Sequence, residues 1–158
     1  MAVRDLLTGI RYSTEWRLAR RYGEIEGVPI AYERDDERRL ITVTVTEPYS
    51  VDDILGVIDR QAAEDTWWYA MLYDLRGVTH ASTEADLQRL ADRVKIVGGG
   101  RTRGPVGIAV GADPATFRAG LMYTRLAGKV VNVEVVLTAA QLDGWLARNA
   151  QRRSSHHP

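Results

Sequence analysis

Residues 68–83, WYAMLYDLRGVTHAST, contain the transition that decides the fold. The part that ends at Leu75 is apolar almost throughout, which is typical of a β-strand covered on both faces. A short polar turn follows, and residues 83–97 then carry apolar side chains at helical spacing. A buried strand that leads through a turn into an amphipathic helix predicts an α/β domain with a central sheet.

A hairpin and a helix are predicted on the N-terminal side of this stretch. Residues 40–47 alternate β-branched apolar residues with threonines, which indicates a strand. Residues 28–33 form a shorter strand, and the polar turn between the two predicts a hairpin. Ser50 and Asp53 then form a capping box at the start of an amphipathic helix over residues 51–64.

The C-terminal side continues the alternation of strands and helices. Strands are predicted at residues 106–110 and 130–137, because both runs are short and rich in apolar residues. Asp113 begins a helix between them, with a proline in its first turn, and Thr138 begins the last helix. The complete order is β-β-α-β-α-β-α-β-α, which predicts one α/β domain with a mixed, largely parallel sheet.

Composition argues against several classes of protein. The 158 residues include no cysteine, and 21 basic residues balance 21 acidic ones. Disulfides and cysteine-ligated metals are therefore excluded, and a neutral chain lacks the basic footprint typical of nucleic-acid binding. We expect no metal, no cofactor and no nucleic-acid partner. We also expect no membrane span, since no apolar run is longer than a strand.

The two ends of the chain are less regular than its middle. Residues 1–27 are predicted to form an N-terminal arm, residues 28–149 the domain, and residues 150–158 a flexible tail. The N-terminal apolar stretch is too short for a signal peptide, so a cytoplasmic location is expected. The arm and the exposed edge of the hairpin both need cover, which favours a homodimer.

The element order and the strand end at residues 74–78, DLRGV, resemble the SpoIIAA-like fold of sulfate-transporter and anti-sigma-factor-antagonist (STAS) domains. The resemblance covers about residues 28–149. In the antagonists the corresponding stretch reads roughly D-L-S-x-V-x-F-x-D-S-S-G, and the first serine after the second aspartate is phosphorylated. Here Thr83 occupies the position of that serine, and Ser82 that of the aspartate. Ala85 replaces the glycine.

The chain also resembles the small bacterial proteins grouped as STAS/SEC14-like. This resemblance depends on the DLRG strand end and on the Trp145-Leu146 pair in the last helix. The antagonist resemblance implies a non-enzymatic regulatory module that contacts a protein partner through residues 76–83 and the following helix. The SEC14-like resemblance implies a carrier of a lipid or another small molecule.

Two residues before the predicted helix, Ser82 and Thr83, have two alternative roles. A hydroxyl at a helix N-terminus is a favourable phosphate site, because free N–H groups and the helix dipole stabilise negative charge. The same hydroxyl is typical of an ordinary N-cap. Together with Asp74, Arg76 and His80, these residues form the candidate phosphoacceptor or partner-contact loop.

No catalytic residue is predicted. Asp74, His80 and Ser82 are the residue types of a hydrolase triad. Ser82 follows His80 by only two residues, which makes a triad with the histidine between the other two hard to form. The nucleophile motif G-x-S-x-G is also missing. We therefore expect a protein that is not an enzyme.

The stretch GGGRTRGP at residues 98–105 is a candidate anion site. Its glycines free the backbone, and Arg101 and Arg103 supply two guanidinium groups. The stretch runs from a helix to a strand, whereas a phosphate-binding P-loop runs from a strand to a helix. A mobile surface loop is therefore the alternative interpretation.

The aromatic residues present a similar choice. Alternation along the predicted strand places Trp68 and Tyr69 on opposite faces, both covered by helices. Together with Trp67, Tyr73 and Tyr123, they either line a ligand pocket or fill the core.

Overall fold

The computed structural model describes residues 28–150, which form a five-stranded sheet in the order β1-β2-β3-β4-β5. β1 and β2 pair antiparallel, and every other neighbouring pair is parallel. The strands are β1 (Ile30–Asp35), β2 (Leu40–Val45), β3 (Ala70–Leu75), β4 (Val106–Val110) and β5 (Val133–Val136). The predicted α/β class and element order are confirmed. The predicted arm over residues 1–27 and the tail beyond Ala150 lie outside the described residues.

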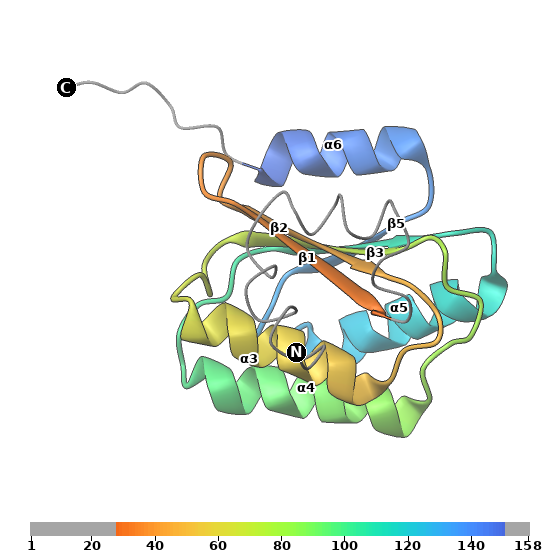
Figure 1. Cartoon of the computed structure of the whole chain (residues 1–158), viewed down its shortest axis with the longest axis horizontal. Helices are drawn as coiled ribbons and strands as arrows, with labels where there is room; N and C mark the ends of the chain where they lie inside the picture. Colours follow the sequence, from red (N-terminus) through yellow and green to blue (C-terminus); the bar gives the residue numbers. More distant parts are fainter. Residues whose placement is uncertain (1–27, 151–158) are drawn as a thin grey trace, which may run out of the picture.

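Helices cover both faces of the sheet. They are α3 (Val51–Ala63), α4 (Glu84–Gly98), α5 (Pro114–Ala127) and α6 (Ala139–Asn149). Each begins after a side chain that accepts a hydrogen bond from a free N–H group of the first turn. These N-caps are Ser50, Thr83, Asp113 and Thr138. Helices α3, α4 and α5 lie on one face, and α6 lies on the other (Figure 1).

The face covered by α6 holds a small and closely packed core. Trp145 is 1% exposed, and it packs against side chains from neighbouring strands. Gly107 of β4 permits this contact, because a Cβ atom there would lie 2.7 Å from Cε2 of the indole. The strand residues in this core are Leu40, Ala70, Leu72, Ala109 and Val136. Their mostly moderate size leaves room for one large side chain from the helix.

The opposite face holds the larger core. Apolar residues of α3, α4 and α5 pack there against the other side of β1 to β5. Tyr32, Tyr69 and Tyr73 point to this face, as do Trp67 and Tyr123. Large aromatic side chains from several elements therefore share one layer, whereas the α6 layer contains a single tryptophan.

The structure moves the boundaries of four predicted strands. β2 ends at Val45, two residues before its predicted end. β1 begins at Ile30 and continues through Asp35, which the sequence assigned to the turn. β5 is shorter than predicted. The predicted strand at Trp68 and Tyr69 is wrong, because these residues form a turn in which the Tyr69 N–H donates to the Thr66 carbonyl at 2.9 Å. Trp68 is therefore 51% exposed, and the prediction that helices cover it is also wrong.

Candidate functional site

An apolar pocket of about 80 Å³ lies between the sheet and the N-terminal halves of α3, α4 and α5. Its exposed lining residues, His80 and Ala81, follow the end of β3, and α/β proteins usually bind ligands at the carboxyl ends of parallel strands. The walls come from elements far apart in the sequence. They include Ile54 and Ile58 of α3, Leu87 and Leu90 of α4, Leu75 of β3 and Ile108 of β4.

The rim segment, residues 76–83, connects β3 to α4, and its residues His80, Ala81 and Ser82 line the mouth of the pocket. Glu47, just after β2, holds this segment in place. Its Oε1 accepts the backbone N–H groups of His80 and Thr79, both at 2.7 Å, and its Oε2 accepts the Thr79 hydroxyl at 3.0 Å. The His80 and Thr79 hydrogen bonds stabilise the charged carboxylate and lower the pKa of Glu47 to about 2.

Two hydroxyl groups meet at the same mouth. The Tyr49 Oη and the Ser82 Oγ lie 3.2 Å apart, and both residues line the pocket. His80 also lines it, and its Nδ1 lies 3.1 Å from Glu47 Oε1. The pocket therefore combines a mouth rich in hydrogen-bonding groups with apolar walls, which is the usual composition of a small-molecule site.

The inner end of the pocket is formed by Tyr73 of β3 and Tyr123 of α5. These residues lie farther from the rim than Leu75 and Thr116 on the same elements, and both are buried. Burial raises the pKa of Tyr73 to about 12, and the Arg103 charge acts in the opposite direction.

Arg103 lies deep in the core and is only 6% exposed. Its Nη2 donates to Gln61 Oε1 at 3.1 Å and lies 3.4 Å from the Met71 sulfur. The guanidinium also stacks on the ring of Trp67, at 4.8 Å from the ring centre. Its Nε and Nη1 have no hydrogen-bond partner among the described residues. The alternative interpretation of residues 98–105 as a mobile surface loop is therefore wrong for Arg103, which is buried.

Gly104 explains how the chain directs Arg103 inward. Its N–H donates to the Trp67 carbonyl at 2.9 Å, so the loop runs directly against the turn before β3. A Cβ at this position would lie 2.1 Å from the carbonyl oxygen of Tyr69. Glycine is therefore required by a close backbone approach, and the residue before it enters the core.

Arg101 occupies a different environment from Arg103, although both contact Trp67. Its side chain is exposed, and its guanidinium donates to the carbonyls of Gly98 and Val97 at 3.1 and 3.0 Å. These are carbonyls of the last turn of α4, which a cation stabilises. The two arginines that the sequence grouped as one candidate anion site thus point to different partners.

The residues predicted as a phosphoacceptor or partner-contact loop do not all belong to the pocket. His80 and Ser82 line the pocket, whereas Asp74, Arg76 and Thr83 do not. Arg76 forms a two-point ion pair with Asp74, at 2.9 and 2.8 Å, which lowers the pKa of Asp74. The Thr83 hydroxyl accepts the Asp86 N–H at 3.2 Å and so acts as the N-cap of α4.

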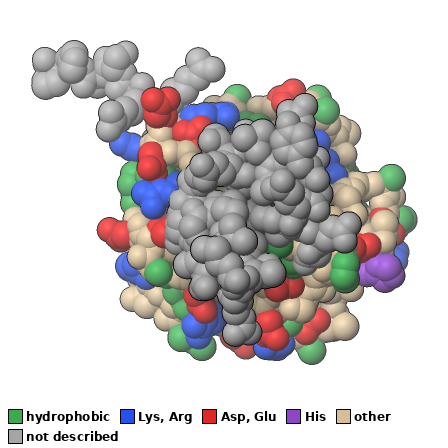
Figure 2. All heavy atoms as spheres, viewed as in Figure 1, with side chains coloured by type: hydrophobic (Ala, Val, Ile, Leu, Met, Phe, Trp, Pro, Cys, Tyr) green, Lys and Arg blue, Asp and Glu red, His purple; other side chains and the backbone are tan. Residues whose placement is uncertain are grey.

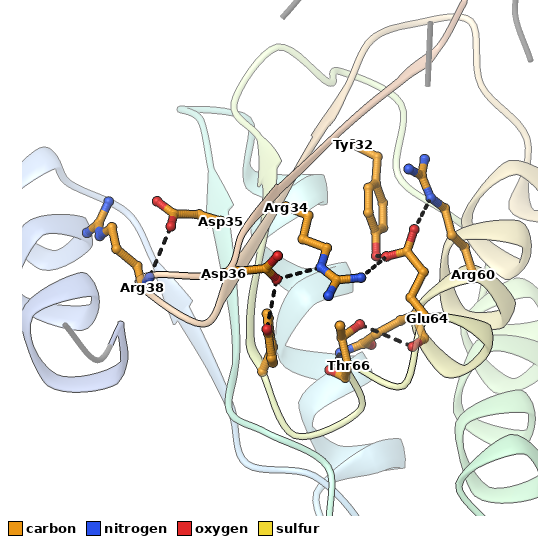
Figure 3. Close-up of polar contacts among 10 residues, drawn as sticks. Tyr32, Arg34, Asp35, Asp36, Arg38, Arg60, Glu64 and Thr66 are labelled. Carbon is orange, nitrogen blue, oxygen red and sulfur yellow. Dashed lines mark hydrogen bonds and ion pairs between the residues drawn. The ribbon is translucent and has the colours of Figure 1, made fainter. Parts of the chain in front are cut away.

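A second polar cluster lies at the other end of α3 (Figure 3). Glu64 accepts the Tyr32 hydroxyl and the Arg60 guanidinium, both at 2.9 Å, and lies 3.6 Å from Arg34. Arg34 also pairs with Asp36 at 2.6 Å. These contacts tie the β1–β2 hairpin to the end of α3, so the cluster explains the position of the hairpin.

The charged residues form no large region of one sign on the face seen in Figure 2, where acidic and basic side chains are interspersed. Among residues 28–150, no group of three His, Asp or Glu side chains is placed to hold a metal ion. No helix in the same range is long and apolar enough to cross a bilayer. The apolar pocket is therefore the feature that we develop as the candidate site.

Sequence reasoning missed several residues of this site. Glu47, Tyr49 and Thr116 belong to the mouth or to the walls, and no motif marks them. A signal was present, because Glu47 and Tyr49 follow a strand whose carboxyl end lies beside that of β3. Of the aromatic residues singled out, Tyr73 and Tyr123 line the pocket, whereas Trp67 packs beneath Arg103.

The chain matches no protein-family model, no characterised protein and no solved structure. Its function must therefore be inferred from the geometry of its own residues.

Proposed function

We propose that this protein is a non-enzymatic binding module that holds a small, largely apolar molecule in the pocket beneath the rim segment. The single observation that carries this proposal is the pocket itself, at the carboxyl end of β3. A module that acts only through surface contacts has no need of such a cavity, whereas a carrier or a sensor does. The resemblance to STAS/SEC14-like proteins agrees with this function.

The size of the pocket limits the ligand. Its volume of about 80 Å³ is roughly half that of an engineered cavity of about 150 Å³ that holds benzene. A short alkyl chain or part of a ring fits inside, and the rest of a larger molecule would extend past the mouth. The hydroxyls of Tyr49 and Ser82 would then contact the emerging part.

The hydrogen bonds at the mouth favour binding over catalysis. His80 is oriented by Glu47, which resembles half of a hydrolase triad. The hydroxyl of Ser82 contacts Tyr49 instead of the histidine. A serine nucleophile needs a base within hydrogen-bond reach, so this arrangement supports recognition of a ligand without a reaction.

A second candidate function is contact with a protein partner through the rim segment. The observation that favours it is that Arg76, Thr79, His80 and Thr83 are exposed although Glu47 holds the segment in one conformation. A preorganised exposed loop loses little conformational entropy when it binds. In this function a phosphate on Thr83 would sit at the N-terminus of α4.

Titration with hexanol and with hexanoate, followed by protein NMR, tests the first proposal. We expect saturable binding of at least one of them to the natural protein. Ala119→Leu adds a side chain from a wall residue and should weaken that binding by about tenfold. Ala115→Leu, on the same helix outside the pocket, is the matched control and should bind as the natural protein does.

Two results would contradict this function. One is that neither molecule binds the natural protein, and the other is that Ala119→Leu binds as well as Ala115→Leu.

For the partner-contact function, Thr83→Glu and Thr83→Ser are compared in pull-down experiments from the source cell. If both variants bind the same partner equally well, the hypothesis that phosphorylation of Thr83 regulates this contact is wrong.

A further inference from the structure

The buried guanidinium of Arg103 is not explained by the fold alone. An arginine side chain stays charged at any ordinary pH, and burying a charge is costly unless an opposite charge pairs with it. No carboxylate of residues 28–150 forms an ion pair with Arg103. Its neighbours are an amide, a thioether and an indole ring, and two of its nitrogens have no partner among the described residues.

Arg103 is connected to the pocket through β3. Tyr73 lines the inner end of the pocket, and Met71, two residues earlier on the same face of β3, has its sulfur 3.4 Å from the Arg103 Nη2. Gln61, which accepts from Arg103, lies one turn of α3 beyond Ile58 of the pocket wall. The positive charge is therefore located just beyond the apolar walls, at the end opposite to the mouth.

The carboxylates near the pocket are found at the mouth. Glu47 holds the rim segment, and Asp113 accepts the hydroxyl of the lining residue Thr116 at 2.8 Å. The Arg103 charge would attract an anionic group of a ligand to the inner end, whereas these two carboxylates already accept hydrogen bonds from the protein. The buried charge of Arg103 thus favours a ligand whose anionic group lies at the inner end.

We infer that the pocket prefers a small apolar carboxylate, whose carboxylate group points inward to Tyr73 and to the charge of Arg103. A carboxylate is favoured over a phosphate because it is smaller, has a single charge and needs fewer donors, which suits a pocket of about 80 Å³ with apolar walls. The alkyl or aryl part would contact the apolar walls, which include Ile58 and Leu90. This inference rests on the proposed function.

Calorimetric titration of the natural protein with hexanoate and with hexanol tests the inference, because the two probes have the same alkyl chain. We expect hexanoate to bind at least about tenfold more tightly, which is the effect of a hydrogen bond to a charged group. Arg103→Met should abolish this preference while hexanol still binds. Arg101→Met, which changes the exposed arginine on the same tryptophan, should keep the full preference.

Tyr73→Phe provides a second test that leaves Arg103 in place. It removes only the hydroxyl at the inner end, and it should reduce the hexanoate preference by about threefold or more. The measurement remains informative if Arg103→Met does not fold, because the natural protein and Tyr73→Phe are compared directly.

The outcomes separate this inference from the proposed function. Hexanol that binds as tightly as hexanoate would overturn the inference and leave the binding function intact. If Arg103→Met still binds hexanoate more tightly than hexanol, the inference is also wrong, because the charge of Arg103 would not be the cause of the preference. If neither probe binds, the proposed function and the inference that rests on it are both wrong.

Discussion

The two faces of the sheet differ in how completely they are packed. On the α6 face, Trp145 fills the space over five strand residues and lies against Gly107. On the face with three helices, β3 and β4 border a pocket, and the buried Arg103 has no ionic partner among residues 28–150. Close packing stabilises a protein, whereas a pocket and an unpaired charge cost stability. Proteins keep such costs mainly at functional sites, so this contrast favours the three-helix face as the functional one.

The largest effect should come from the well-packed face. Trp145→Ala removes a side chain that is 1% exposed and leaves a cavity, so we expect the free energy of unfolding to fall by about 3–5 kcal/mol. Trp68→Ala is the matched control, because that indole is 51% exposed and should cost about 1 kcal/mol or less. Urea denaturation measures both, and equal losses would contradict the contrast in packing.

An alanine-to-leucine substitution on each face of the sheet compares the free space on the two faces directly. Ala109, in the core beside Trp145, is 1% exposed, and Ala109→Leu should cost about 1–3 kcal/mol through overpacking. Ala119→Leu directs the same added atoms toward the pocket and should cost less than about 1 kcal/mol. The contrast fails if the pocket-side variant loses as much stability in denaturant titrations as the α6-side variant.

The mouth of the pocket should depend on pH through Glu47. The folded state lowers its pKa from 4.5 to about 2, so its stabilising effect is complete above 4.5 and is lost as the pH falls towards 2. Glu47→Gln should therefore speed amide exchange at Thr79 and His80 near neutral pH, and this difference from the natural protein should shrink below pH 4.5. Glu37→Gln, in the exposed hairpin turn, is the control and should leave these amides unchanged. A difference that stays constant with pH would contradict the role of the carboxylate.

The smallest effect on stability should come from Arg103. Arg103→Met removes a donor to Gln61, which costs about 1–3 kcal/mol, and it also removes a buried charge of comparable cost. We expect the free energy of unfolding to change by about 1 kcal/mol or less, although Arg103 is nearly as buried as Trp145. A loss as large as that of Trp145→Ala would show that Arg103 serves the fold and not a ligand.

The order of elements could be predicted because it depends on local patterns. Alternating threonines and β-branched residues determine β2, and the capping residues Ser50 and Thr138 mark the starts of helices. Such signals act within one or two turns of the chain, so they can be recognised without tertiary contacts. Trp68 was mispredicted because the preceding turn, closed by Thr66, overrides its apolar character.

The site could be predicted only in part, because it is assembled from distant segments. The rim residues His80 and Ser82 were found through their position between a strand and a helix. The burial of Arg103 depends on the close approach of Gly104 to the turn before β3, which no local pattern encodes. The glycine-rich loop therefore predicts a candidate anion site or a mobile surface loop, and neither interpretation places Arg103 in the core.

The most direct test of the central claim is to map hexanoate binding by NMR chemical shifts of the backbone amides. The account predicts that the largest shift changes cluster at the rim segment and at the pocket-facing turns of α4 and α5, while α6 remains unchanged. Shift changes centred on α6, or the absence of any saturable change, would contradict it.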